Sequence, residues 1–367
     1  MLPSFYWQGG GGKNMHTALL NHALFIGIDA HPTTHTAYAM NRFEDEKGML
    51  TFDNSPEGIK IFLSWIQTIE TAGKNVIIGV EGGGNARHAL LRHLLETYQN
   101  LYEVNPLYTK QRRMFGTKKD KSDPRDAKLI AEVLTRKLDE LPLITLHDLS
   151  SGMLILRKTV WFYEQITDEG VAQQNQLHQL KREDELSLDT MEKKVLAMMI
   201  KERKKSLEQV RKTQQRCRKT LENLLTKQGK NLTTFNGVSI ILAAKIVAHS
   251  GGIERFKNIN DFIQYAGIAP REHSSGKTKR HKKAKFGNRN LNHAFYMVAL
   301  QQIRRDSPGK DYYDKKLKEG KTKKHALKCV MKRVACILYG MLKNGSDFQK
   351  KEKKDSLEKL KNIDPLT

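Results

Sequence analysis

The sequence predicts an α/β domain over residues 21–148, a helical insert over residues 149–231, and a second, mostly α-helical domain over residues 232–345. Three observations support this division. Short apolar runs alternate with helical patterns in the first part. The second part has almost no proline, many charged residues and leucines at helical spacing. Ala-rich apolar helical patterns return in the third. Residues 1–20 read as a flexible extension and residues 346–367 as a charged tail.

The α/β domain opens with three strand patterns, LFIGID, THTAYAM and GMLTFDN, separated by turn-forming residues. A helix near Pro56, a strand over residues 76–80, a helix over about residues 85–98, the short strand LYEV and the helix DPRDAKLIAEVLTRKL follow. Parallel strands need helices over both faces of their sheet. The order of elements matches a ribonuclease-H-like domain.

The insert fits long antiparallel helices or a coiled coil best. A solvated helical linker is compatible with the same residues. A role in dimerisation or in gripping RNA stays open at this point.

The second domain begins with the turn FNGVS and an apolar, Ala-rich helix. The pattern continues through FKNINDFIQYAG, a basic loop over residues 271–287, a helix around LNHAFYMVALQQIRR and a final helix within KKHALKCVMKRVACILYGMLK.

The charge balance indicates a polyanionic partner. The 64 Lys and Arg residues outnumber the 40 Asp and Glu residues, and the formal net charge is +24. Nucleic acid is the first candidate, and an anionic membrane surface is the alternative. No apolar run approaches the roughly 20 residues of a membrane span. Three cysteines favour a reducing, cytoplasmic setting. The first residues lack the apolar region of a secretion signal, and Met15 is an alternative start.

Four carboxylates form the candidate chemical site. Asp29 and Glu81 each end an apolar strand, and ligand sites of α/β sheets lie beyond the carboxyl ends of their strands. Asp123 and Asp126 lie three residues apart at a helix start and so share a face. Clustered carboxylates repel one another without a cation, and hard divalent cations prefer oxygen ligands. The cluster therefore predicts Mg²⁺, with Mn²⁺ as an alternative.

Structural explanations compete with this interpretation. Asp123 precedes Pro124, so Asp123 is a natural N-cap with Asp126 at the third helical position. Taken alone, capping is the better explanation for this pair. His31 and His35 follow Asp29, and a solvated turn explains them better than a metal or phosphate contact.

Basic residues gather in the second domain as a predicted phosphate-binding segment. They are Lys277, Lys279, Arg280, Lys282, Lys283 and Lys285, followed by Asn288 and Arg289.

The order of several motifs resembles the DEDD transposases of insertion sequences, which include pilin-gene inversion recombinases and bridge-RNA-guided elements. The matching pieces are GIDAH, GVEGGG, KSDPRDAKLIAEVL, FNGVSIILAAKIVAHSG, FIQYAGIAPREHSSGKTKR, KFGNRNLNHAFY and YYDKKLKEGKTKKHALKCVMKRV. Together they cover nearly the whole chain after Met15.

The resemblance implies a RuvC-like domain whose four acids are Asp29, Glu81, Asp123 and Asp126, and a transposase domain with a nucleophilic serine at Ser275. Ser274 is an adjacent rival. The serine would form a covalent phosphoserine link with DNA. The FNGVS turn resembles the start of a helix-hairpin-helix module, with Asn236 and Ser239 where relatives commonly have proline and glycine.

The expected function is therefore DNA cleavage and rejoining by a homo-oligomer, a dimer or tetramer, during excision, insertion or inversion. In part of the family an element-encoded guide RNA pairs with the DNA, so the resemblance adds RNA to the expected partners. Two alternatives remain. One is a plain metal-dependent nuclease of the Holliday-junction resolvase type, and the other is a non-catalytic nucleic-acid-binding scaffold.

Overall fold

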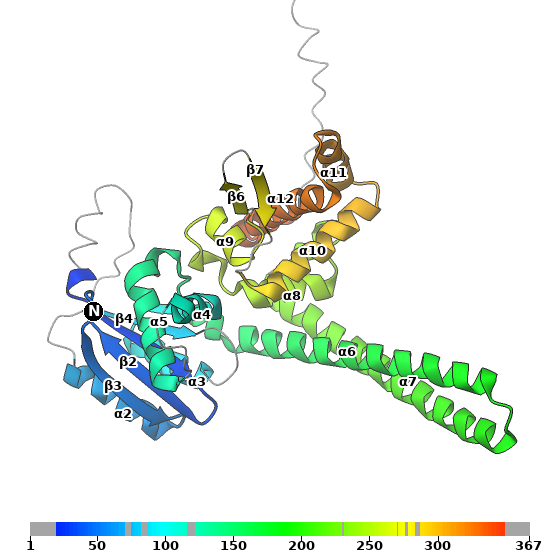
Figure 1. The fold of residues 1–367 in the computed structure, drawn as a ribbon, viewed down its shortest axis with the longest axis horizontal. Coiled ribbons are helices and arrows are strands. Elements are labelled where there is room, and N and C mark those ends of the chain that lie inside the picture. Colours follow the sequence, from blue (N-terminus) through cyan, green and yellow to red (C-terminus); the bar gives the residue numbers. More distant parts are fainter. Residues whose placement is uncertain are drawn as a thin grey trace, which may run out of the picture. The chain divides into compact units, whose positions relative to one another are not determined.

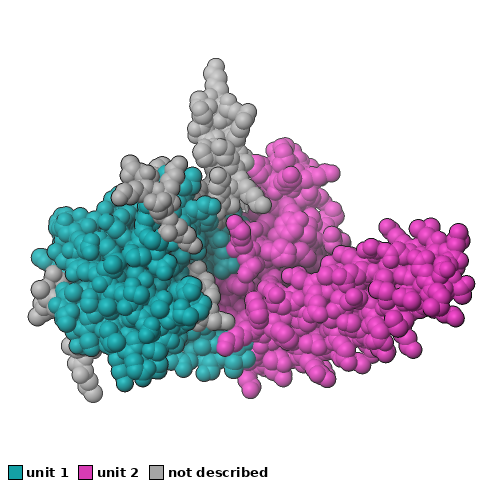
Figure 2. All heavy atoms as spheres, turned by 60° about the horizontal axis from the view of Figure 1, so that its bottom comes forward, with its two compact units in different colours: residues 1–155, 251–288 teal, residues 156–250, 289–367 magenta. Residues whose placement is uncertain are grey.

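A computed structural model of the chain describes residues 20–69, 75–81, 87–115, 122–229, 231–269, 271–275, 278–282 and 287–348. The chain forms two compact units (Figure 2). Unit 1 contains residues 1–155 and 251–288, and unit 2 contains residues 156–250 and 289–367. Nearly all of the expected N-terminal extension and C-terminal tail lies outside the described residues. The domain boundaries drawn from the sequence stay predictions.

Unit 1 is built on a five-stranded sheet with the order β3-β2-β1-β4-β5. The strands are β1 (Leu24–Ala30), β2 (Thr34–Met40), β3 (Glu46–Asp53), β4 (Val76–Glu81) and β5 (Leu101–Val104). The first three strands pair antiparallel, whereas β4 pairs parallel with both β1 and β5. The predicted meander and α/β order are confirmed, and the sheet is consistent with a ribonuclease-H-like domain.

Helices cover both faces of this sheet (Figure 1). On one face, α2 (Pro56–Ile69) and α3 (His88–Thr97) pack against residues such as Ile26 and Ile78. On the other face, α5 (Asp123–Lys137) packs against Phe25 and Ile77. Helix α4 (Pro106–Phe115) lies against α5, and the sequence analysis did not predict it.

The segment of unit 1 beyond residue 250 contains the 3₁₀ turn η4 (Ile253–Arg255) and helix α9 (Ile259–Tyr265). Strands β6 (Arg271–Ser275) and β7 (Thr278–Lys282) then pair antiparallel. The segment expected to be a basic loop therefore contains a two-stranded hairpin.

Two long helices dominate unit 2: α6 (Ser151–Leu186), whose first turn belongs to unit 1, and α7 (Thr190–Lys227) (Figure 1). The Asp189 side chain caps α7 by accepting a hydrogen bond of 2.7 Å from the Glu192 backbone N–H. The two helices share a small apolar cluster that includes Leu177 and Leu207. We call this pair the helical arm. The predicted long helices are confirmed, and their classification as a coiled coil stays a prediction.

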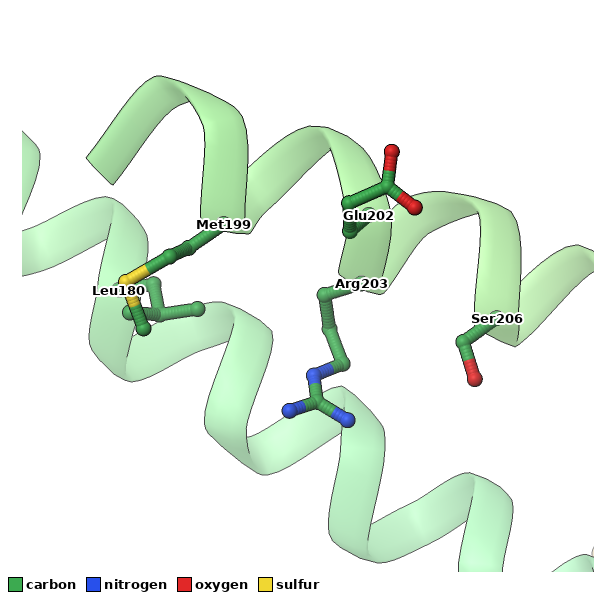
Figure 3. A pocket seen from close by; sticks show the side chains of 5 residues that line it. All are labelled: Leu180, Met199, Glu202, Arg203 and Ser206. Atoms are coloured by element: carbon green, nitrogen blue, oxygen red, sulfur yellow. The ribbon is translucent and has the colours of Figure 1, made fainter. Parts of the chain in front are cut away.

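A shallow hollow on the helical arm is lined by Leu180 and Met199, which point toward each other, and by three polar residues (Figure 3). The polar residues are Glu202, Arg203 and Ser206. None of the sequence-predicted site residues lines this hollow.

The described remainder of unit 2 is mostly helical. Its helices are α8 (Ile240–Ser250), α10 (Arg289–Arg304), α11 (Pro308–Lys318) and α12 (Lys323–Asn344). Helix α10 packs against α8 and α12, and α11 also contacts α12. The patterns predicted α8, α10 and α12 correctly, but not α11. Within the described ranges, no helix combines the length and the apolar character needed to cross a membrane.

Candidate active site

Asp29 and Glu81 lie side by side at one edge of the sheet. Strands β1 and β4 are parallel neighbours, and their register pairs Ile28 with Val80 immediately before the two acids. Both acids are half-buried, whereas the apolar residues before them are buried. The convergence expected from the sequence is therefore present in the fold.

Two glycines determine which helix lies over these acids. Gly27 and Gly79 are register partners, each two residues before an acid. A Cβ atom on Gly27 would lie 2.2 Å from the backbone oxygen of Ala127 in α5, and one on Gly79 would lie 2.8 Å from the side chain of Leu134. Side chains two residues apart on a strand share a face. Asp29 and Glu81 therefore belong to the face that α5 covers.

Asp126 enters the same region from the start of α5. It directly precedes Ala127, and it is buried at 6% exposure. Asp123 is exposed, although it belongs to the same first turn. The structure thus places Asp29 and Glu81 side by side at the end of the sheet, with Asp126 in the helix that covers this face, and leaves Asp123 at the surface.

The capping interpretation of Asp123 was wrong. Ser122 is the N-cap of α5, in extended conformation, and Asp123 is already the first helical residue. The Asp126 backbone N–H donates to the Ser122 carbonyl oxygen at 2.9 Å. Asp126 lies one position further into the helix than a capping-box residue, and its carboxylate pairs with an arginine instead.

Helix α4 supplies the partners of two acids. The Thr109 hydroxyl donates to Glu81 Oε1 at 2.6 Å, and the Arg113 guanidinium donates to Asp126 Oδ1. Thr109 and Arg113 are four residues apart and therefore lie on one face of the helix. The neighbouring Arg112 pairs instead with Glu132 of α5, with 2.9 Å between Nε and Oε2.

The donor set fits a hard divalent cation because all the candidate ligands are carboxylates. Among the described residues, no three His, Cys, Asp or Glu side chains are close enough together to hold a metal ion. Two of the candidate carboxylates are turned toward Thr109 and Arg113.

A buried ion network joins the far segment of unit 1 to this sheet. Arg255 of η4 donates to Glu103 of β5, and its guanidinium lies 3.7 Å from Asp148. Burial opposes the charge of Arg255, yet Tyr265, Glu103 and Asp148 together raise the pKa of the guanidinium above its ordinary value. Glu103 pairs in register with Val80, next to Glu81. The segment that carries β6 and β7 is therefore anchored to β5, on the face of the sheet opposite to the one that carries Glu81.

Arg87 extends the same network toward Glu81. Its guanidinium donates to Glu103 at 3.2 Å and to the backbone oxygen of Glu81 at 3.4 Å. Because both arginines use Glu103, this carboxylate connects the Arg255 segment with the end of β4.

Ser275 is the last residue of β6 and pairs with Thr278, while Ser274 pairs with Lys279. The two ends of the hairpin segment meet closely. A Cβ on Gly287, whose φ is +115°, would lie 2.4 Å from the Gly267 nitrogen. The Asn288 N–H donates to the Tyr265 carbonyl oxygen at 2.7 Å.

Five of the eight predicted phosphate-binding residues lie within the described part of the chain. Lys279, Arg280 and Lys282 belong to β7. Asn288 is half-buried beside Tyr265, and Arg289 is exposed at the start of α10. Lys277, Lys283 and Lys285 lie outside the described residues.

The two histidines after Asp29 differ. His31 is exposed in the turn, with 3.2 Å between its ring nitrogen and the Thr33 hydroxyl. His35 is fully buried in β2, edge-on to Phe52, so the expectation of a solvated turn was wrong for it. Burial lowers the pKa of the His35 imidazole below its ordinary value of 6.5.

The predicted helix-hairpin-helix turn packs within unit 2. Gly237 has a left-handed φ of +89°, and the Asn236 carbonyl accepts a hydrogen bond from Gln302 of α10. The Ser239 hydroxyl accepts from the Leu242 N–H at 3.3 Å, as an N-cap of α8 does.

The residues of α4 that contact the acids were not predicted from the sequence. A signal was present in Asn105 followed by Pro106, since asparagine caps helices and proline suits the first helical position. Indeed, the Asn105 side chain accepts a hydrogen bond of 2.9 Å from the Leu107 N–H.

Comparison with known proteins shows which families and proteins this chain is similar to. A transposase family model of the DEDD type matches residues 26–183, and the model of the IS116/IS110/IS902 transposase family matches residues 229–314. The pilin gene-inverting protein of Moraxella bovis is 23% identical over 334 residues, which is 89% of this chain and 98% of that protein.

Insertion-element proteins match over a shorter stretch. An IS110 protein of Streptomyces coelicolor is 30% identical over 119 residues, or 32% of this chain, and an IS900 protein of Mycobacterium paratuberculosis is 33% identical over 115 residues, or 31% of this chain. Each match spans 29% of the relative's own length. The two family models and the ordered acids agree, and the chain belongs to the DEDD transposase family of insertion sequences.

Proposed function

We propose that this chain cleaves and rejoins DNA as the transposase or site-specific recombinase of a mobile element. The observation that carries the proposal is the placement of Asp29 and Glu81 at the ends of neighbouring strands, with Asp126 in the first turn of the helix that covers their face of the sheet. Clustered carboxylates of this kind suit a divalent cation in phosphoryl transfer.

Asp29, Glu81 and Asp126 would hold Mg²⁺, or Mn²⁺ in its place, with Asp123 as a fourth ligand from the exposed start of α5. A bound cation would neutralise charge that develops on the phosphate oxygens. The protein's own contribution is rigidity, since β1, β4 and α5 position the carboxylates from packed backbone.

Ser275 would supply the nucleophile, with Ser274 as its rival. The serine oxygen forms a bond to phosphorus while one bridging phosphorus–oxygen bond breaks, and the released deoxyribose oxygen takes up a proton. A deoxyribose hydroxyl of a second DNA end reverses this exchange and frees the serine. The family relationship and the anchoring of this segment by Arg255 support the assignment.

DNA is the substrate that the basic charge and the family relationship support. A homo-oligomer, a dimer or tetramer, would bring together the active sites that two DNA ends require. Exposed apolar residues favour the helical arm, a coiled coil in the proposal, as a contact between copies. They include Met191 of α7 and Leu188 in the turn between the two helices. An element-encoded guide RNA would supply sequence recognition.

The test uses the full chain with its native flanking DNA and resolves covalent protein–DNA adducts on denaturing gels. Wild type and Ser274→Ala should form the adduct in Mg²⁺, whereas Ser275→Ala should form none. Asp29→Asn and Asp126→Asn should lower the reaction by about a thousandfold or more.

The alternatives give different results. Free DNA cleavage by Ser275→Ala would support a plain metal-dependent nuclease. Intact recombination by the two aspartate variants would overturn the catalytic site altogether. Sequencing of RNA that copurifies with the chain tests the guide, since a guided enzyme should enrich one discrete noncoding RNA.

A further inference from the structure

We infer that Arg113 and a divalent cation compete for Asp126, and that cation binding releases the Arg113 guanidinium to bind a DNA phosphate. Thr109 competes with the cation for Glu81 in the same way, but more weakly. The inference rests on the proposed function, because it concerns the same acids.

The contacts of α4 occupy the oxygens that a cation would need. Thr109 donates to Glu81 Oε1 and Arg113 donates to Asp126 Oδ1. The two carboxylates come from different elements, β4 and α5, yet one face of α4 reaches both. A cation held by both acids would draw these oxygens toward itself and away from α4.

Thr109 can give up its contact at little cost. A threonine hydroxyl has one proton to donate. The Thr109 oxygen lies 2.6 Å from Glu81 Oε1 and 2.9 Å from the Pro106 carbonyl oxygen. When Glu81 turns to a cation, the same proton is donated to the backbone of α4, and the buried hydroxyl keeps a partner.

Among the described residues, Arg113 has no second hydrogen-bond partner of this kind. The Arg113 Nε atom is buried and has no hydrogen-bond partner in the described part of the chain. Arg112 differs, because both its Nε and Nη2 atoms donate to Glu132. Without Asp126, the Arg113 guanidinium would be a partly buried, unpaired charge. Binding of another anion would stabilise it.

A DNA phosphate is the anion that suits this position. A guanidinium presents several N–H donors in one plane, which match the oxygens of a phosphate. Arg113 lies beside the acids at which the proposed reaction occurs. Cation binding would thus prepare the site for its substrate as well as for the chemistry.

The first test measures Mn²⁺ binding to the full chain without DNA, by isothermal titration calorimetry. Arg113→Gln should bind Mn²⁺ about tenfold more tightly than wild type, because the competing charge is gone. Arg113→Lys, which keeps the charge, should stay closer to wild type. Thr109→Val should strengthen binding by less than Arg113→Gln.

Arg112→Gln is the matched control. It removes an arginine–carboxylate pair between the same two helices but leaves the candidate ligands untouched. Its Mn²⁺ affinity should stay within about twofold of wild type. Thermal melts of both glutamine variants show whether each is folded, and Arg113→Lys provides the comparison should Arg113→Gln unfold.

The second test measures DNA binding against salt concentration. In Mg²⁺, Arg113→Gln should reduce the slope of log affinity against log salt by about one phosphate contact. In EDTA, wild type and Arg113→Gln should have equal slopes. Equal slopes in Mg²⁺ would overturn the phosphate contact.

Failure of this inference is distinct from failure of the proposed function. If Asp126→Asn abolishes Mn²⁺ binding while Arg113→Gln binds like wild type, the competition is wrong and the metal site stands. If wild type and every variant fail to bind Mn²⁺, the proposed metal site itself is wrong.

Discussion

The sheet that carries Asp29 and Glu81 and the helical arm differ in how far their apolar side chains are buried. Phe25, Ile26 and Ile28 of β1 are completely buried, because helices cover both faces of the sheet. In the arm, Met198 is 60% exposed, and Leu188 in the turn between its two helices is 98% exposed. The difference indicates that the sheet fixes the positions of the acids, whereas the arm leaves apolar side chains exposed.

The largest effect should come from Gly27→Ala, which tests the packing of α5 on the sheet. The new Cβ would collide with backbone atoms of α5, and a helix backbone cannot yield without moving the helix. We expect a loss of about 3 kcal/mol in the free energy of unfolding, measured by urea denaturation.

Gly79→Ala is its matched control. The new Cβ would meet the ends of the Leu134 side chain rather than backbone, and this side chain can rotate away. We expect a smaller loss, about 1 kcal/mol. Equal losses for the two variants would show that direct backbone contact does not position α5.

A smaller effect should follow from Leu207→Ala, which tests the arm. Leu207 is buried in the small cluster between α6 and α7, so its truncation should cost about 2 kcal/mol, the lower end for a buried leucine. Hydrogen exchange should accelerate in α6 and α7 only. Faster exchange in β1 or β4 would show that the two regions are not independent. The control Met198→Ala, at an exposed position, should change neither the free energy of unfolding nor the exchange rates.

The smallest effect concerns pH and the buried His35. Its folded pKa is lowered by burial, so below about pH 6.5 the unfolded chain binds a proton that the folded chain resists. Stability should therefore fall as pH decreases through this range. His35→Phe should lessen that fall in thermal melts between pH 7 and 5, and an unchanged pH profile would contradict the assignment.

The sequence predicted the sheet well because each strand carries a local signal. The runs ending at Asp29 and Glu81 are apolar, bounded by turn residues and buried as expected. Helix α4 escaped prediction because polar residues make many of its contacts, beside the packing of Tyr108 against the core. The polar contacts come from Thr109, Arg112 and Arg113, whose partners are distant in sequence.

The candidate site was predictable in its acids and less so in their surroundings. Strand ends identified Asp29 and Glu81. Local capping rules placed the N-cap at Asp123 instead of Ser122, and they could not predict that Arg113 pairs with Asp126. The link from Arg255 to Glu103 joins residues 152 positions apart, and no local pattern encodes such a pair. The role of Ser275 came from the resemblance alone and stays a prediction.

The close approach of Gly267 and Gly287 has a consequence for the segment between them. Backbone contacts hold both ends of the intervening segment at one place, so residues added inside it would not by themselves separate these ends. Doubling the length of a flexible loop costs only about 0.6 kcal/mol in closure entropy. The stretch that carries Ser275 can therefore change in length while the sheet and its acids stay unchanged.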